Sequence, residues 1–80
     1  MVKIYIVDLT AEEKEELLEL TSRGQARVRK LKRAQILLLA SESKKDETIA
    51  EMLHVGRATV ERTRKRFVLE GLHAALNDRP

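Results

Sequence analysis

Three residues separate two helix-forming segments in the second half of the chain, and this spacing restricts the fold more than any other feature. Residues 47–53 place apolar side chains on one face of two helical turns, with Asp46 as the expected N-cap. Residues 57–69 continue as a longer, strongly basic helix, and the "HVG" at 54–56 is too short to separate the two. The chain therefore contains a crossed helix pair, the sequence form of a helix-turn-helix.

The side chains at the buried positions of this motif agree with the interpretation. Ala50 lies where the two helices cross, and a larger side chain there would push the second helix off the first. The remaining pattern positions are apolar, so the expected core of the motif consists of Ile49, Ala50, Leu53, Val55, Val60 and Phe67.

The composition is that of one small helical domain. A chain of 80 residues buries about 60% of the surface that its unfolded form exposes, enough for a single core. With 36% charged residues, one Tyr, one Phe, one Pro and three Gly, helices are favoured over a β-sandwich or barrel. The chain has no cysteine, and no apolar stretch reaches the roughly 20 residues that span a bilayer. We expect an all-α protein of the cytoplasm with no membrane contact.

Two further helices are predicted in the N-terminal half. "TAEE" at 10–13 is a capping box, and the helix it starts runs to about Ser22 and ends at Gly24. A second helix is expected over 26–41, basic in its first half ("RVRKLKR") and apolar in its second. Its expected core residues are Leu31, Ala34, Leu38 and Leu39.

The two ends of the chain are expected to be less regular. Residues 1–9 include the β-branched "VKIYIV" and are predicted to form a short extended arm. Gly71 suits a left-handed C-cap for the basic helix, and Leu72 packs after it before a last short turn. Residues 77–80 begin a linker, so residues 1–80 form one domain of about four helices.

Positive charge is concentrated in the part of the chain that contains the helix pair. Residues 1–26 hold three basic and six acidic side chains, net −3, whereas residues 27–80 hold thirteen and seven, net +6. Residues 57–66 alone carry five cations and one glutamate, net +4. Such a run fits a solvated helix face or an anionic partner, so charge alone does not decide the function.

At 100° per residue, the helix over 57–69 divides into distinct faces. Val60, Thr63 and Phe67 lie toward the core, Ala58, Arg62 and Lys65 lie opposite, Thr59 and Arg66 lie on one flank, and Arg57 lies on the other. An exposed helix with a small residue near its start can enter the DNA major groove, with its first turn at base edges and its later cations at phosphates. The residues thus predict double-stranded DNA as the partner.

The chain also resembles a known family along nearly its whole length. "LTAEEKEEL", "KLKRAQILLLA", "DETIAEMLHVGRATVERTRKRF" and "EGLHAALNDRP" are similar to the N-terminal helix-turn-helix domain of bacterial transposases of the mariner-related insertion-sequence-630 branch. In that family the domain binds the terminal inverted repeats of its element and precedes a ribonuclease-H-like catalytic domain. The resemblance implies a homeodomain-like fold and a role in transposition, a form of DNA recombination.

The resemblance also assigns roles to residues of the basic helix. It implies base contacts for Arg57, Ala58 and Arg62, and phosphate contacts for Thr59, Lys65 and Arg66. The sequence departs from the family pattern at His54, Gly56 and Thr63, where a Gly, a Ser and an apolar or Trp residue are usual. The sequence stops where the basic linker of the family begins, so we expect a DNA-binding part with no catalytic domain.

Two alternative functions stay open from the residues. One is a helix-turn-helix transcriptional regulator, and the other is a helical module for protein interaction or oligomerisation. The basic face argues against the second, because protein interfaces deplete Lys at their centre. An enzyme is not expected, since His54 and His73 are the only histidines, 19 positions apart, and no glycine-rich phosphate loop occurs. We expect no metal, cofactor or small-molecule substrate, and a homodimer is compatible with the sequence.

Overall fold

The computed structural model describes residues 5–24 and 26–77, which form five helices. In chain order these are α1 Ala11–Arg23, α2 Val28–Ser41, α3 Asp46–Leu53, α4 Arg57–Glu70 and α5 Leu72–Leu76. The described residues contain no strand, so the predicted all-α class is confirmed, with one short helix more than expected. The parts of the predicted arm and linker at 1–4 and 78–80 lie outside the described residues.

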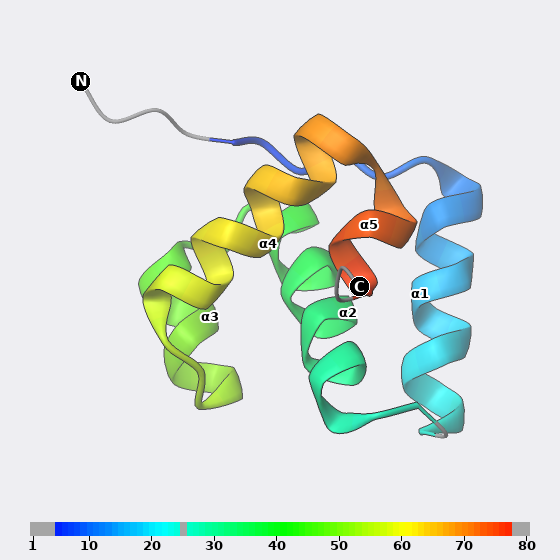
Figure 1. Ribbon diagram of the computed structural model, residues 1–80, viewed down its shortest axis with the longest axis horizontal. Coiled ribbons are helices and arrows are strands. Elements are labelled where there is room, and N and C mark those ends of the chain that lie inside the picture. The colour runs from blue at the N-terminus through cyan, green and yellow to red at the C-terminus, as the bar shows by residue number, and fades with distance from the viewer. Residues whose placement is uncertain (1–4, 25, 78–80) are drawn as a thin grey trace.

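The bundle is built around α2. This helix contacts α1, α3, α4 and α5, and Figure 1 shows α1 and α3 on opposite sides of it, with α4 crossing in front. Because several helices cover it, the fully buried side chains of α2 form a broad face rather than a narrow stripe: Ala34, Ile36, Leu37 and Ala40. Of the predicted core residues only Ala34 is fully buried, whereas Leu31, Leu38 and Leu39 stay partly exposed.

The helix ends match the sequence signals at α1 and differ at α2 and α3. The Thr10 hydroxyl accepts from the Glu13 N–H and the Glu13 carboxylate accepts from the Thr10 N–H, so the predicted capping box is confirmed. α2 begins two residues later than predicted, at Val28. Asp46 is not an N-cap, because Lys45 takes that position and Asp46 is the first helical residue.

The turn between α3 and α4 falls at the predicted residues, 54–56. His54 adopts the left-handed conformation (φ 55°, ψ 48°) that ends α3, and the Val55 N–H donates to the Ala50 carbonyl over 3.1 Å, as in a Schellman turn. Ile49 and Val60 are fully buried where the two helices meet. The other predicted core residues of the motif pack against them and are partly buried: Ala50, Leu53, Val55 and Phe67.

Gly71 connects α4 to α5 in a conformation that differs from the expected left-handed helical cap. Its φ of 97° and ψ of 177° lie in a region that essentially only glycine occupies. The reversal brings Leu72, Ala75 and Leu76 of α5 into the core. The segment predicted as a last turn before a linker is therefore a structural part of the bundle.

The described part of the arm is anchored to the bundle. Residues 5–9 form neither helix nor strand, Val7 is buried and Leu9 packs against the core.

None of the helices in the described ranges has the length and apolar character needed to cross a membrane.

We predict that Gly71→Ala lowers the free energy of unfolding by about 1–3 kcal/mol, because a side chain cannot adopt this backbone conformation without strain. A Cβ at position 71 would meet no atom within 4 Å, so the loss would come from the backbone alone. Urea denaturation measures the change. Gly56→Ser is the matched control, because Gly56 has an ordinary φ of −70° and a serine N-cap should leave stability unchanged or a few tenths of a kcal/mol higher. Equal stability of Gly71→Ala and the unmodified protein would contradict the assigned conformation.

Candidate nucleic-acid interface

The buried face of α4 fixes which side chains the helix presents to solvent. Val60 and Thr63 are buried, and the Thr63 hydroxyl donates to the Thr59 carbonyl over 2.8 Å, which satisfies the polar group inside the core. Ala58, Arg62 and Lys65 lie on the opposite, exposed side. The predicted division of α4 into a core face and an outer face is confirmed.

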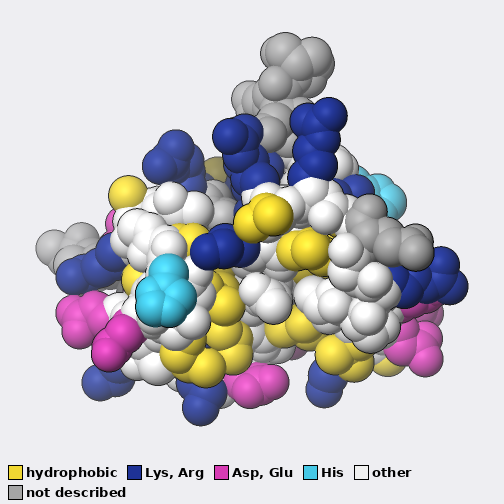
Figure 2. Space-filling model, turned by 90° about the horizontal axis from the view of Figure 1, so that it is seen from below, with side chains coloured by type: hydrophobic (Ala, Val, Ile, Leu, Met, Phe, Trp, Pro, Cys, Tyr) yellow, Lys and Arg dark blue, Asp and Glu magenta, His cyan; other side chains and the backbone are white. Residues whose placement is uncertain are grey.

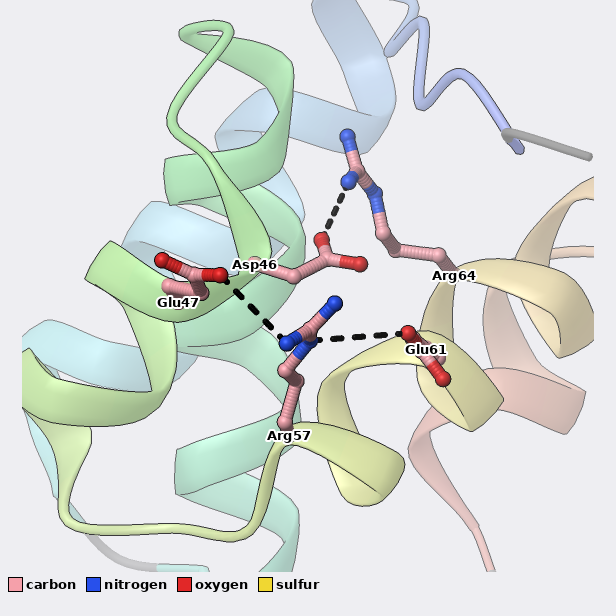
Figure 3. A network of polar contacts seen from close by, with 5 residues as sticks. All are labelled: Asp46, Glu47, Arg57, Glu61 and Arg64. Atoms are coloured by element: carbon pink, nitrogen blue, oxygen red, sulfur yellow. Dashed lines mark hydrogen bonds and ion pairs between the residues drawn. The ribbon is translucent and has the colours of Figure 1, made fainter. Parts of the chain in front are cut away.

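A group of ion pairs joins one flank of α4 to the first turn of α3, as Figure 3 shows. Arg64 pairs with Asp46 at the start of α3, and their side chains are only 12% and 22% exposed. Asp46 is also favourably placed against the positive end of the α3 helix dipole. The Arg64 Nε is buried and has no hydrogen-bond partner among the described residues. This pair holds the middle of α4 against the first turn of α3.

Arg57 belongs to the same flank but stays in solvent. Its guanidinium lies 3.3 Å from a Glu47 carboxylate oxygen of α3 and 3.8 Å from one of Glu61 on α4, and all three side chains are more than half exposed. The side chain is therefore shared between two carboxylates (Figure 3). In contrast, neither Arg62 nor Lys65 has a hydrogen bond or ion pair to any described residue.

The other flank of α4 faces α2 and α5. Thr59 and Arg66 lie there, partly buried, and Arg66 donates to the Asn77 carbonyl over 3.4 Å. An open hollow separates this flank from α2, and five of its lining residues are cations: Arg29, Lys32, Arg33, Arg62 and Arg66. In Figure 2, which views the molecule from below, several Lys and Arg side chains stand along the upper part of the face, where no acidic side chain is seen, and both kinds occur at its sides and lower edge.

The structure thus brings the predicted site residues together in part. Ala58, Arg62 and Lys65 share the outer face, Thr59 and Arg66 line the hollow beside it, and Arg57 is drawn toward α3. The α2 cations of the hollow received no role from the sequence, although the basic run "RVRKLKR" was the available signal. No three His, Cys, Asp or Glu side chains within 5–24 and 26–77 converge as metal ligands would.

Comparison with known proteins gives one match. The family model for the homeodomain-like domain matches residues 27–76, which include α2, α3, α4 and α5. No curated protein and no solved structure matches the chain. The match supports a helix-turn-helix DNA-binding domain.

We predict that Asp46→Ala lowers the free energy of unfolding by about 2–3 kcal/mol, because it leaves the largely buried Arg64 cation without its partner. Thermal or urea unfolding measures the loss. Glu47→Ala is the matched control on the same turn, since its ion pair is exposed and such pairs contribute about 0–1 kcal/mol. Equal losses in the two variants would show that the Asp46 pair does not hold α4 in place.

Proposed function

The chain belongs to the homeodomain-like family, and from that premise we propose that it binds double-stranded DNA sequence-specifically with the outer face of α4 in the major groove. The observation that carries the proposal is the exposed face formed by Ala58, Arg62 and Lys65 on a helix whose opposite face is locked into the core. Its two cations are not neutralised by any described residue, so they are available to an anionic partner.

The dimensions of α4 suit the groove. Its 14 residues make a helix about 20 Å long, and the major groove is about 12 Å wide, enough to admit one helix. Ala58 in the first turn allows the helix backbone to come close to the base edges. Arg62, one turn later on the same face, offers two parallel N–H donors that match the O6 and N7 acceptors of guanine.

The other polar residues of α4 fall into two groups: those that we assign to phosphates, and Arg57, which can contact a base only after it leaves its ion pairs. We assign phosphate contacts to Lys65, Thr59 and Arg66, which lie along the outer face and the flank beside the hollow. Arg57 can contact a base only by exchanging its contacts with Glu47 and Glu61 for DNA. Exposed ion pairs of this kind contribute about 0–1 kcal/mol each, so the exchange is accessible to a duplex that offers guanine.

We further propose that the chain is the DNA-binding part of a transposase and that its target is the terminal inverted repeat of an insertion sequence. The support is the similarity of "DETIAEMLHVGRATVERTRKRF" and "EGLHAALNDRP" to the insertion-sequence-630 branch. A transcriptional regulator is the alternative with the same chemistry at α4. Selecting bound duplexes from the genomic DNA of the source organism separates the two, because a transposase domain enriches element ends and a regulator enriches promoter regions.

We predict that Arg62→Ala weakens binding to the selected site by about 1–3 kcal/mol and relaxes its sequence preference, because a bidentate contact to guanine is lost. Lys65→Ala should weaken binding equally on selected and random duplexes. It should also reduce the log–log salt slope by about 0.9, the contribution of one phosphate contact. Fluorescence anisotropy on both duplexes at several salt concentrations measures each effect.

The two variants control for each other, because each removes one positive charge from the same face of α4. Proportional losses on both duplexes for both variants would contradict base contact by Arg62 and indicate a helix that lies along the DNA backbone. Absence of binding by the unmodified chain at micromolar concentration and low salt would overturn the proposed function itself.

We predict that Glu61→Gln tightens DNA binding by about 0.5–1 kcal/mol, because it removes a negative charge beside the phosphates and one of the two carboxylates that hold Arg57. Anisotropy titration at low salt measures the gain, which should shrink as salt rises. Glu15→Gln is the matched control, an equal charge change at an exposed position of α1. Weaker binding by Glu61→Gln would contradict this account and indicate that Glu61 accepts a hydrogen bond from a cytosine instead.

A further inference from the structure

Two open hollows adjoin along the first half of α2 and form one continuous surface. The hollow nearer α1 is lined by five cations: Arg23, Arg27, Arg29, Lys30 and Arg33. The hollow nearer α4 shares two of these and adds three more: Lys32, Arg62 and Arg66. No Asp or Glu from the described ranges lines either hollow. We call this surface the α2 trough.

Part of this charge has a structural use. Lys32 donates to the Leu53 carbonyl over 2.7 Å at the end of α3, and Arg33 donates to the Leu76 carbonyl over 3.4 Å at the end of α5. Cations at the last carbonyls of helices are favourable, so these two side chains help to hold the bundle together. They do not explain the rest of the trough.

The cations at the start of α2 oppose the stability of the fold. Arg27 is the N-cap, Arg29 and Lys30 lie in the first turn, and that turn contains no acidic residue. Positive side chains at the positive end of a helix dipole are destabilising, and the neighbouring charges repel one another. Neither Arg27 nor Lys30 has a hydrogen bond or ion pair within the described part of the chain. The protein thus keeps Arg27 and Lys30 without a partner among the described residues, at a position where its own stability disfavours positive charge.

The shape of the trough indicates an extended anion. Residues 27–33 cover about 9 Å along the axis of α2 at 1.5 Å per residue. Successive phosphates of one DNA strand advance about 3.4 Å along the duplex axis and lie farther apart along the strand itself, so this length faces about two of them. At its other end the trough includes Arg62 and Arg66 of α4, so an anion bound along it is continuous with the duplex at the outer face of that helix.

We propose that the α2 trough holds the sugar-phosphate backbone of the same duplex whose major groove receives α4. This inference rests on the proposed function and extends it to a second contact surface on another helix. The α2 cations of the trough contact phosphates in this arrangement, and a phosphate contact carries no sequence information, so they anchor the duplex irrespective of sequence. Its contribution is to affinity and to the orientation of α4, whereas sequence preference comes from α4.

The test is the double variant Arg27→Gln/Lys30→Gln, measured by anisotropy on selected and random duplexes over a range of salt concentrations. Each phosphate contact contributes about eightfold to binding at 0.1 M salt relative to 1 M. Loss of two contacts should therefore weaken binding on the order of 10- to 60-fold on both duplexes and reduce the salt slope by about 1.8. Sequence preference should not change.

The same variant should raise the melting temperature by a few degrees, because it removes two cations from the positive end of α2. Weaker binding with higher stability cannot arise from a partly unfolded variant. Lys14→Glu is the matched control, because it also changes the net charge by two at an exposed α1 position that lines neither hollow. It should leave binding within about twofold of the unmodified protein.

The outcomes separate this inference from the proposed function. If the unmodified chain binds DNA and the double variant binds as tightly as Lys14→Glu, the trough does not contact the duplex and only this inference falls. The same holds if the double variant loses its sequence preference, since that would make the trough a base-contacting surface. If the unmodified chain binds no duplex at all, the proposed function falls first.

Discussion

Every functional feature of this domain depends on how α4 is held against α2 and α3. The left-handed backbone at His54 and the hydrogen bond from Val55 to Ala50 set the reversal between α3 and α4. Burial of Val60 then fixes the rotation of α4 about its axis, and the Arg64–Asp46 pair fixes it from the side. A small rotation would move Arg62 off the outer face, so the packing of the core determines which side chains would meet DNA in the proposed complex.

Some of the positive charges of this small protein lower the stability of its fold. A domain of 80 residues has a modest core, yet it keeps Arg27 and Lys30 at the start of α2 without a partner among the described residues, and it largely buries Arg64. Three carboxylates, those of Asp46, Glu47 and Glu61, lie on one flank of α4, where they contact Arg57 and Arg64. No Asp or Glu from the described ranges lines the α2 trough. This asymmetry is the electrostatic basis for the proposed approach of an anionic duplex from that side of α4.

The sequence was sufficient for the elements whose signals are local. The capping box at Thr10, the turn at His54 and the two faces of α4 follow from spacing alone and were predicted correctly. The core of α2 was not predicted correctly. Four neighbouring helices decide which of its apolar residues are covered, and Leu37 rather than Leu38 is buried. The N-cap role expected of Asp46 was wrong, and the ion pairs that Asp46 and Arg57 form across the two helices were not predicted. Their partners lie 18 and 10 positions away, and only the crossing of α3 and α4 brings them together.

The central claim is that the outer face of α4 is the surface that meets DNA. Titrating the ¹⁵N-labelled chain with a duplex selected for binding, and following its amide chemical shifts, tests this claim most directly. The account predicts the largest changes between Ala58 and Lys65 and in the first turn of α2, with the exposed residues of α1 unchanged. Changes confined to α1 and residues 5–9, with α4 unaffected at saturating DNA, would contradict it.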